Sequence, residues 1–229
     1  MLTRALSGNY INFGVFELYN DPALNDALDI AIKMGLSIPL SDVLAYRKVA
    51  RAYFSLVDTL CHSHIRMVVL CNTQTFSHII YSLEQGLKSL DVGISSQCAS
   101  AIDNIATFYF NRLPIDENGD DAAQAIATHL SNVGSLLLDI LQALFEMVLY
   151  QDCANQWSLS RPMLSIILVN ESYYSEVKAR VVNGHPPERQ QKLSSGFDKL
   201  MHDVKPTLDP KNRDRFTQNL TTISSTKTV

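Results

Sequence analysis

The stretch QDCANQWSLSRPMLSIILVNESYY, residues 151–174, decides how the rest of the chain is interpreted. It holds the only tryptophan, Trp157, in a polar corner that runs into Pro162. The apolar run from Leu164 to Val169 follows, and such a run is typical of a buried helix. The stretch therefore predicts a turn that enters a buried helix at Pro162. If the corner is buried, Trp157→Ala costs about 3–5 kcal/mol, and a change below about 1 kcal/mol places the corner on the surface.

Amphipathic helical patterns continue on both sides of this stretch. From Phe76 to Leu90, apolar residues recur at helical spacing. Asp21 and Asp209 each precede a proline, which places a capping residue directly before a favoured first helical residue. No run shows the alternation expected of a strand. The sequence predicts an all-α protein of about nine to eleven helices, joined mostly by short turns into antiparallel hairpins.

Stacking of such hairpins side by side gives a HEAT-type α-solenoid, whose repeat unit is about 40–47 residues. Because no residue-level repeat is visible, a globular helical bundle also satisfies the pattern. Leu2 to Leu6 resembles the last turns of a helix, and Ser7-Gly8-Asn9 resembles its C-cap. We therefore expect residues 1–8 to be the remnant of a preceding helix, and residues 1–229 to be a fragment of a larger protein. The polar tail, residues 224–229, is expected to fray.

The composition favours a protein with a large core that meets other proteins. Of its 229 residues, 46% are apolar and 18% are charged. The net charge of −4 argues against a nucleic-acid partner, which calls for a basic face. None of the four cysteines forms a C-x-x-C pair, and all lie in or beside apolar helical patterns, which is typical of free thiols in a reducing compartment. They are Cys61, Cys71, Cys98 and Cys153.

Residues 133–150 form the most apolar long segment. Their length approaches the threshold for a membrane span. However, Asp139, Gln142 and Glu146 fall on one helical face, and carboxylates at bilayer depth are costly. The segment therefore predicts a mostly buried helix and no membrane insertion.

No stretch has the pattern of a catalytic, cofactor or metal site. Cys61-His62-Ser63-His64 has metal-ligand residue types, but they sit too close together at one helix end to surround zinc. A solvated helix C-terminus, where histidine suits the helix dipole, is the simpler interpretation. There is no G-x-S-x-G motif and no glycine cluster for phosphate. We therefore predict that the chain is not an enzyme, and we assign no catalytic, cofactor, metal or binding residue.

Two charged segments allow more than one interpretation. The loop of residues 114–121 contains the pairs Asp116-Glu117 and Asp120-Asp121 without EF-hand spacing, so we expect these carboxylates to be solvated. Residues 211–215, KNRDR, are locally basic. They are expected to form an exposed helix start with internal charge pairing, and the alternative is a contact for an acidic protein surface.

Four segments resemble the C-terminal region of the exportin-7 and Ran-binding protein family of the importin-β (karyopherin-β) superfamily. The first is the stretch of residues 151–174. The others are SGNYINFGVFELYNDPALNDAL (7–28), SIPLSDVLAYRKVARAYFSLVDTL (37–60), and the pair VNGHPPERQQK (182–192) and KNRDRFTQNL (211–220). They occur in the same order as in the family and cover nearly the whole chain.

This resemblance implies a HEAT-repeat segment of a nuclear transport receptor. The family carries folded protein cargo through the nuclear pore under the control of the GTPase Ran, so the implied partners are Ran, cargo and nucleoporins. The implied locations are nucleus, cytoplasm and nuclear pore. The N-terminal repeats that chiefly grip Ran in the family are absent, so we expect this chain alone to bind Ran weakly or not at all. The alternative function is a stand-alone helical scaffold that bridges proteins without a transport cycle.

Overall fold

The computed structural model describes residues 2–7, 15, 18–19, 21–114, 120–150 and 155–225. All regular structure within these ranges is helical, which confirms the predicted all-α class. The helices are α1 (Leu2–Leu6), α3 (Ala23–Ser37), α4 (Leu40–Ala45), α5 (Arg47–Ser63), α6 (Ile65–Val69), α7 (Thr73–Leu87), α8 (Val92–Phe110), α9 (Asp121–Asn132), α10 (Leu136–Tyr150), α11 (Gln156–Val169), α12 (Glu171–Asn183), α13 (Pro187–Leu200) and α14 (Pro210–Ser225). In this described part, α1, α4 and α6 are single turns of five or six residues, and ten longer helices carry the architecture.

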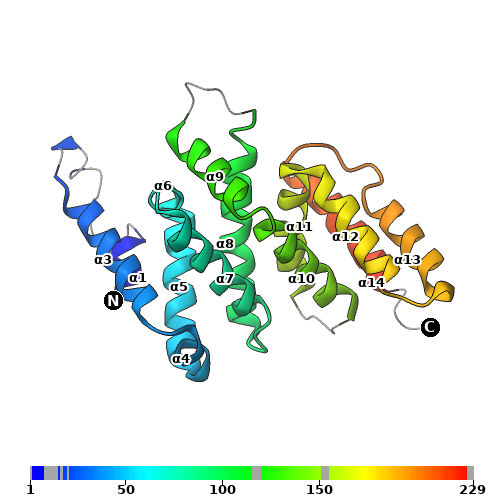
Figure 1. Ribbon diagram of the computed structural model, residues 1–229, viewed down its shortest axis with the longest axis horizontal. Coiled ribbons are helices and arrows are strands. Elements are labelled where there is room, and N and C mark those ends of the chain that lie inside the picture. Colours follow the sequence, from blue (N-terminus) through cyan, green and yellow to red (C-terminus); the bar gives the residue numbers. More distant parts are fainter. Residues whose placement is uncertain are drawn as a thin grey trace.

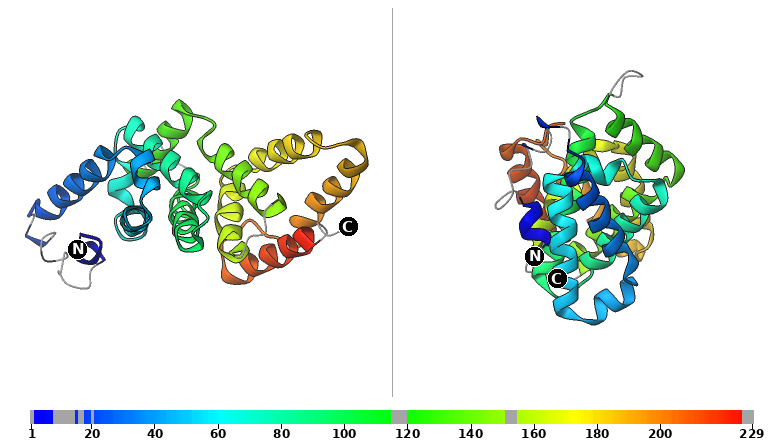
Figure 2. Two further views of the ribbon diagram at one scale, coloured as in Figure 1. Left: turned by 90° about the horizontal axis from the view of Figure 1, so that it is seen from below. Right: turned by 90° about the vertical axis from the view of Figure 1, so that its left-hand side faces the viewer.

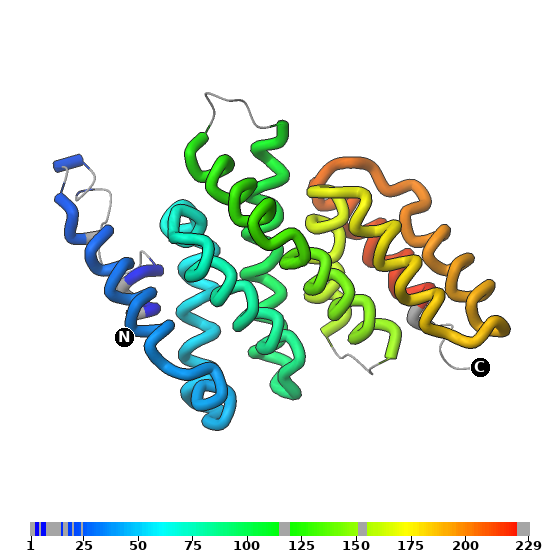
Figure 3. The backbone as a smooth tube through the Cα atoms, in the orientation of Figure 1, coloured from blue at the N-terminus to red at the C-terminus, as the bar shows by residue number. Residues whose placement is uncertain are grey.

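The longer helices stack in two rows along the long axis of the molecule (Figure 1). In one row, α1, α5, α8, α11 and α14 each pack against the next. In the other, α7 packs against α10 and α10 against α12, while α13 joins α12 to α14. The chain runs from α1 and α3 at one end of the stack to α13 at the other, and α14 turns back to pack against α11 (Figure 3). This arrangement confirms the predicted α-solenoid of helix hairpins.

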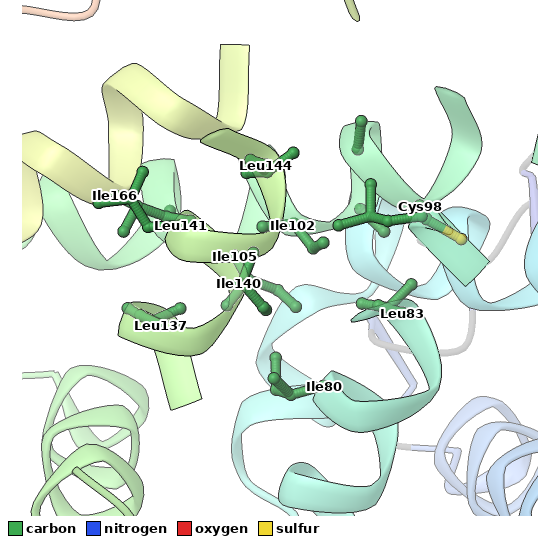
Figure 4. Packing of buried hydrophobic residues seen from close by; sticks show 14 of the residues in the cluster. Ile80, Leu83, Cys98, Ile102, Ile105, Leu137, Ile140, Leu141, Leu144 and Ile166 are labelled. Carbon is green, nitrogen blue, oxygen red and sulfur yellow. The ribbon is translucent and has the colours of Figure 1, made fainter. Parts of the chain in front are cut away.

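The centre of the core lies where α7, α8, α10 and α11 meet (Figure 4). Branched aliphatic side chains from all four helices fill it, and each is at most 3% exposed. This packing explains the helical spacing of the sequence, since every third or fourth residue faces the neighbouring row. The labelled residues are Ile80, Leu83, Cys98, Ile102, Ile105, Leu137, Ile140, Leu141, Leu144 and Ile166.

The helix at the tryptophan corner begins earlier than predicted. α11 starts at Gln156, so Pro162 lies inside the helix. The Asn155 side-chain amide donates to the hydroxyls of Ser95 and Ser96 on α8, at 3.1 and 3.2 Å, and anchors the first turn there. Since α11 packs along α8, tertiary contacts outweigh the local preference of proline for a helix start. Residues 151–154 of the same stretch lie outside the described residues.

Replacing Trp157 with alanine is expected to lower the free energy of unfolding by no more than about 1 kcal/mol. The residue sits on the first turn of α11 and is 54% exposed, so little apolar area returns to water. Urea unfolding of the Trp157→Ala and wild-type proteins, followed by circular dichroism, measures the change. A loss of about 3 kcal/mol would mean that the indole is buried.

The apolar segment before this corner is a buried helix, α10, in agreement with the prediction. Asp139 and Glu146 are exposed on it, and the Gln142 amide donates to the Glu146 carboxylate at 2.9 Å. Within the described ranges, no single helix is long and apolar enough to cross a membrane. By length and composition, only α9 and α10 together could do so, and these helices are bent by 76° where they join.

Both ends of the described chain are helical. α1 forms as predicted, and Leu6 packs in the core against α5. The predicted cap residues Gly8 and Asn9 lie outside the described residues. α14 extends to Ser225, which includes the first two residues of the tail that is expected to fray. Residues 226–229 are also outside the described part.

Gly35→Ala is expected to raise the free energy of unfolding by about 0.5–1 kcal/mol. Gly35 is part of α3 and lines an apolar cavity of about 20 Å³ between α3, α5, α6 and α7. An added Cβ would lie 3.8 Å from Tyr53 Cε2, which is ordinary contact distance. Alanine therefore gains helix propensity without a clash. Urea unfolding measures the gain, and a destabilised variant would contradict this packing.

Candidate interaction surface

The side chains of Cys61, His62 and His64 do not come together at one site. Cys61 is buried in the core, whereas His62 is exposed. His64 Nε2 hydrogen-bonds to the Leu6 carbonyl at 2.9 Å, so this histidine ties α1 to the end of α5 instead of being solvated. Among the residues that the structure describes, no group of three or more His, Cys, Asp or Glu side chains could hold a metal ion.

The basic segment KNRDR is partly buried, which corrects the expectation of an exposed helix start. The Arg213 guanidinium on α14 donates to both carboxylate oxygens of Asp103 on α8, at 2.9 and 3.0 Å. It also donates to the Thr107 hydroxyl at 3.0 Å and to the Leu208 carbonyl at 3.1 Å. Arg213 therefore joins two helices of the solenoid, and only Lys211 and Arg215 of the segment's basic residues remain exposed.

The last two residues of the acidic loop, Asp120 and Asp121, form contacts with neighbouring parts of the fold. Asp120 caps α9 by accepting from the Ala122 amide at 3.1 Å, and it forms ion pairs with Arg112 and Arg66. Asp121 pairs with Arg66 as well. The expectation of solvated carboxylates is therefore wrong for Asp120, on which Arg66 of α6 and Arg112 beyond the end of α8 converge, whereas the Asp121 side chain is 65% exposed. The other pair, Asp116-Glu117, lies outside the described residues.

These contacts predict that the folded protein loses stability at acidic pH. The Arg112 guanidinium, followed by Arg66 and the Ala122 amide, holds the pKa of Asp120 well below its usual value. A carboxyl with a lowered pKa stabilises the fold above its unfolded pKa, near 4, and loses that contribution as the pH falls toward its folded pKa. Asp120→Asn is expected to flatten the decline in stability below about pH 4. Urea unfolding between neutral and acidic pH measures this, and parallel pH profiles for variant and wild type would contradict it.

Asp58 on α5 has a buried carboxylate atom. Its Oδ1 atom has no hydrogen-bond partner among the described residues. Burial raises the pKa of Asp58, while the Ser100 hydroxyl and nearby His62 oppose the rise.

The cysteines described in the structure are free, as predicted. Cys61 and Cys98 are buried and Cys71 is partly buried. Burial raises the pKa of each thiol, which disfavours the nucleophilic thiolate. Cys153 lies outside the described residues.

One exposed surface joins the turns of two hairpins, and we call it the turn patch: Tyr46, Arg47, Arg51, Leu90 and Val92. Asp91, which caps α8, holds Arg47 at 2.9 Å and Arg51 at 2.8 Å. Arg47 and then Arg51 lower the pKa of Asp91. Leu90 was expected on the apolar face of α7, but that helix ends at Leu87 and leaves Leu90 fully exposed.

A second exposed surface lies on α3 at the N-terminal end of the solenoid. Ile30 is 53% exposed and Met34 is 61% exposed there. The opposite face of α3, with Leu28, Ala31 and Ile32, is buried. Both surfaces offer apolar area beside charge, which suits the binding of proteins.

Comparison with curated proteins finds relatives along almost the whole chain. The chain is 38% identical over 229 residues to Exportin-7-B of Xenopus laevis. It is 36% identical over 226 residues to Ran-binding protein 17 of Homo sapiens, and 30% identical over 220 residues to Exportin-7 of Dictyostelium discoideum. Each match covers 96% of this chain.

The chain spans only about a fifth of these relatives' own length, since the matches cover 21–22% of each. No family model matches the chain. No solved structure matches it either.

Proposed function

We propose that this chain is a segment of a nuclear transport receptor. The chain is homologous over nearly its whole length to one segment of exportin-7 and the Ran-binding proteins. The receptor carries protein cargo and is regulated by the GTPase Ran. The observation that carries the proposal is the colinear match over 96% of the chain to proteins named as exportins. No comparison favours the alternative of a stand-alone scaffold.

The proposed action is binding without catalysis. A curved stack of hairpins presents long surfaces to other proteins, and small rotations between hairpins change their curvature. Ran and cargo then influence one another's binding through the shape of one solenoid, which is a coupling between two sites. Nucleoporins are proposed as further partners, and the proposed locations are the nucleus, the cytoplasm and the nuclear pore.

The turn patch is the described surface that fits a protein partner best in this role. It combines two arginines with exposed Tyr46, Leu90 and Val92. Aromatic residues and arginine are enriched in protein interfaces. The carboxylate of Asp91 keeps both arginines in place, so the patch is ordered before a partner arrives.

A pull-down tests the transport proposal. Ran loaded with GTP or with GDP is immobilised and offered the longest protein product that contains residues 1–229. We expect retention on the GTP form and little on the GDP form, and weak or no retention of residues 1–229 alone. A long form that ignores the nucleotide would contradict the proposal.

We also propose that the chain acts as the C-terminal part of a longer receptor. The lengths of the relatives support this, as they extend far beyond the matched segment. An antibody against residues 152–173 should detect a band several times heavier than 25.6 kDa in the source cells. A single band near that mass would favour a protein that works independently.

A further inference from the structure

An open groove of about 320 Å³ lies between α11 and α14, and we call it the tryptophan groove: Trp157, Gln218, Thr221 and Thr222. The Ser160 hydroxyl on α11 lies 2.7 Å from the Thr217 hydroxyl on α14, and this contact ties the two helices together beside the groove. Trp157 is the only tryptophan of the chain and is 54% exposed. Its indole N–H makes no hydrogen bond within the described ranges. The groove therefore offers an apolar ring and a spare donor to a ligand.

The tryptophan groove lies inside the stack of helices and not at either of its ends. α8 also packs against α11, and α13 packs against α14. In the left-hand view of Figure 2, α13 (orange) closes the end of the stack, whereas α14 (red) runs along its long side. A further hairpin stacked on either end would therefore leave the groove open.

Three exposed cations border the groove. Arg161 lies one turn after Trp157 on the same face of α11, since residues four apart are neighbours on a helix. Lys211 and Arg215 precede Gln218 on one face of α14, at spacings of four and three residues. None of these three cations forms an ion pair with a described residue. All three are therefore available to an anionic ligand.

The described carboxylates near the groove leave most of this charge unbalanced. Asp103 of α8 is already engaged, because Arg213 holds both of its oxygens. Asp214 is the only acidic residue of α14, so it offsets one of the three cations. The described border of the groove thus keeps a net positive charge in a chain whose net charge is −4. An acidic ligand is complementary to this border.

We propose that the tryptophan groove binds an acidic segment of a partner protein that carries one apolar side chain among its carboxylates. The apolar side chain packs on the indole ring of Trp157, and the indole N–H donates to a backbone carbonyl of the segment. The carboxylates pair with Arg161 and Arg215, since the planar guanidinium holds a carboxylate with two N–H groups. Tryptophan and arginine are also the side chains that carry most of the binding energy in many protein interfaces.

A nucleic acid fits the groove less well than an acidic protein segment. A phosphate backbone calls for a broad basic face, whereas here the cations flank a single indole and Asp214 stands among them. The proposed site goes beyond the transport role, and its tests contain no Ran. Either proposal can therefore fail while the other stands.

Fluorescence of Trp157 tests the proposal directly, because the only tryptophan of the chain lines the groove. The 229-residue chain is titrated with a synthetic peptide of glutamates around one leucine, which contains no aromatic residue. We expect a saturable blue shift of the emission, with a dissociation constant of about 10–100 µM. The absence of a shift would overturn the proposal, as would an equal shift with a peptide in which glutamines replace the glutamates. Tighter binding of a single-stranded oligothymidine would overturn it too and assign the groove to nucleic acid.

Charge reversal tests the two arginines. Arg161→Glu and Arg215→Glu are each expected to weaken binding of the glutamate peptide about tenfold, because each turns an attraction into a repulsion. Arg189→Glu is the matched control, since Arg189 is an exposed arginine of α13 that lines no part of the groove and forms no ion pair with a described residue. We expect this control to bind like wild type. Equal weakening by all three variants would show a general charge effect and overturn the proposed contact.

Replacement of Trp157 tests the role of the ring, with binding followed by the anisotropy of a dye attached to the glutamate peptide. Trp157→Ala is expected to weaken binding about tenfold, because it removes the apolar platform. Trp157→Phe keeps an aromatic surface and should bind more tightly than Trp157→Ala. The side chain is 54% exposed, so both variants should fold, as circular dichroism will verify. A folded Trp157→Ala variant that binds the peptide like wild type would overturn the proposal.

Discussion

Arg213→Ala is expected to lower the free energy of unfolding by about 3–5 kcal/mol, the range for breaking one side of a buried ion pair. The side chains of Arg213 and Asp103 are only 10% and 16% exposed. Without the guanidinium, the Asp103 carboxylate loses two charge-assisted hydrogen bonds and stays largely shielded from water. The Leu208 carbonyl and the Thr107 hydroxyl each lose a donor as well.

Arg215→Ala is the control for this prediction. Arg215 belongs to the same basic segment and the same helix, but it is exposed, so its loss should change stability by no more than about 0.5 kcal/mol. Urea unfolding of both variants measures the difference. In a double-mutant cycle, Arg213→Ala/Asp103→Ala should cost clearly less than the sum of the two single changes, because the pair is removed together. Additive costs would mean that the two residues do not interact.

Gly86→Ala is expected to lower the free energy of unfolding by about 3 kcal/mol, at the upper end of the range for overpacking a core. Gly86 lies in α7, where this helix approaches α5 and α8 most closely. An added Cβ would lie 2.6 Å from Phe54 Cε1 and also too close to the Cys98 sulfur. Neither Phe54 nor Cys98 is exposed to any extent, so neither side chain has room to move away.

Phe54→Leu supplies the test of this mechanism. Combined with Gly86→Ala, it should cost less than the two single changes together, because the smaller side chain removes the clash. Gly35→Ala is the matched control in a neighbouring helix, where the same methyl group has space and stability should rise. Thermal unfolding ranks the wild type, the three single variants and the double variant. A Gly86→Ala variant as stable as wild type would contradict the close approach of the helices.

Much of the fold could be predicted from the sequence because helical spacing is a local property. The run from Phe76 to Leu87 shows its buried face without any knowledge of its neighbours, and Asp21-Pro22 marks the start of α3 in the same way.

The candidate surfaces could not be predicted from the sequence, because they depend on contacts between residues that are far apart in the chain. Arg47 and Arg51 pair with Asp91 across 44 and 40 residues of sequence, and this pairing orders the turn patch. Nothing in the local pattern shows which cation a given carboxylate will meet. The same reason explains why Asp120 was expected in solvent and lies between Arg66 and Arg112.

The sequence by itself determined the helical class and, through its long motifs, the family resemblance that implies a solenoid, whereas the helical pattern alone also fitted a globular bundle. Only the tertiary structure decided which polar residues are buried. KNRDR is a basic, hydrophilic run, and burial of Arg213 became favourable only when α14 packed where Asp103 supplies a carboxylate. Trp157 is the reverse case, since this large apolar side chain on the first turn of α11 stays 54% exposed. Periodicity follows from the backbone of one helix, whereas burial depends on which helix packs beside it.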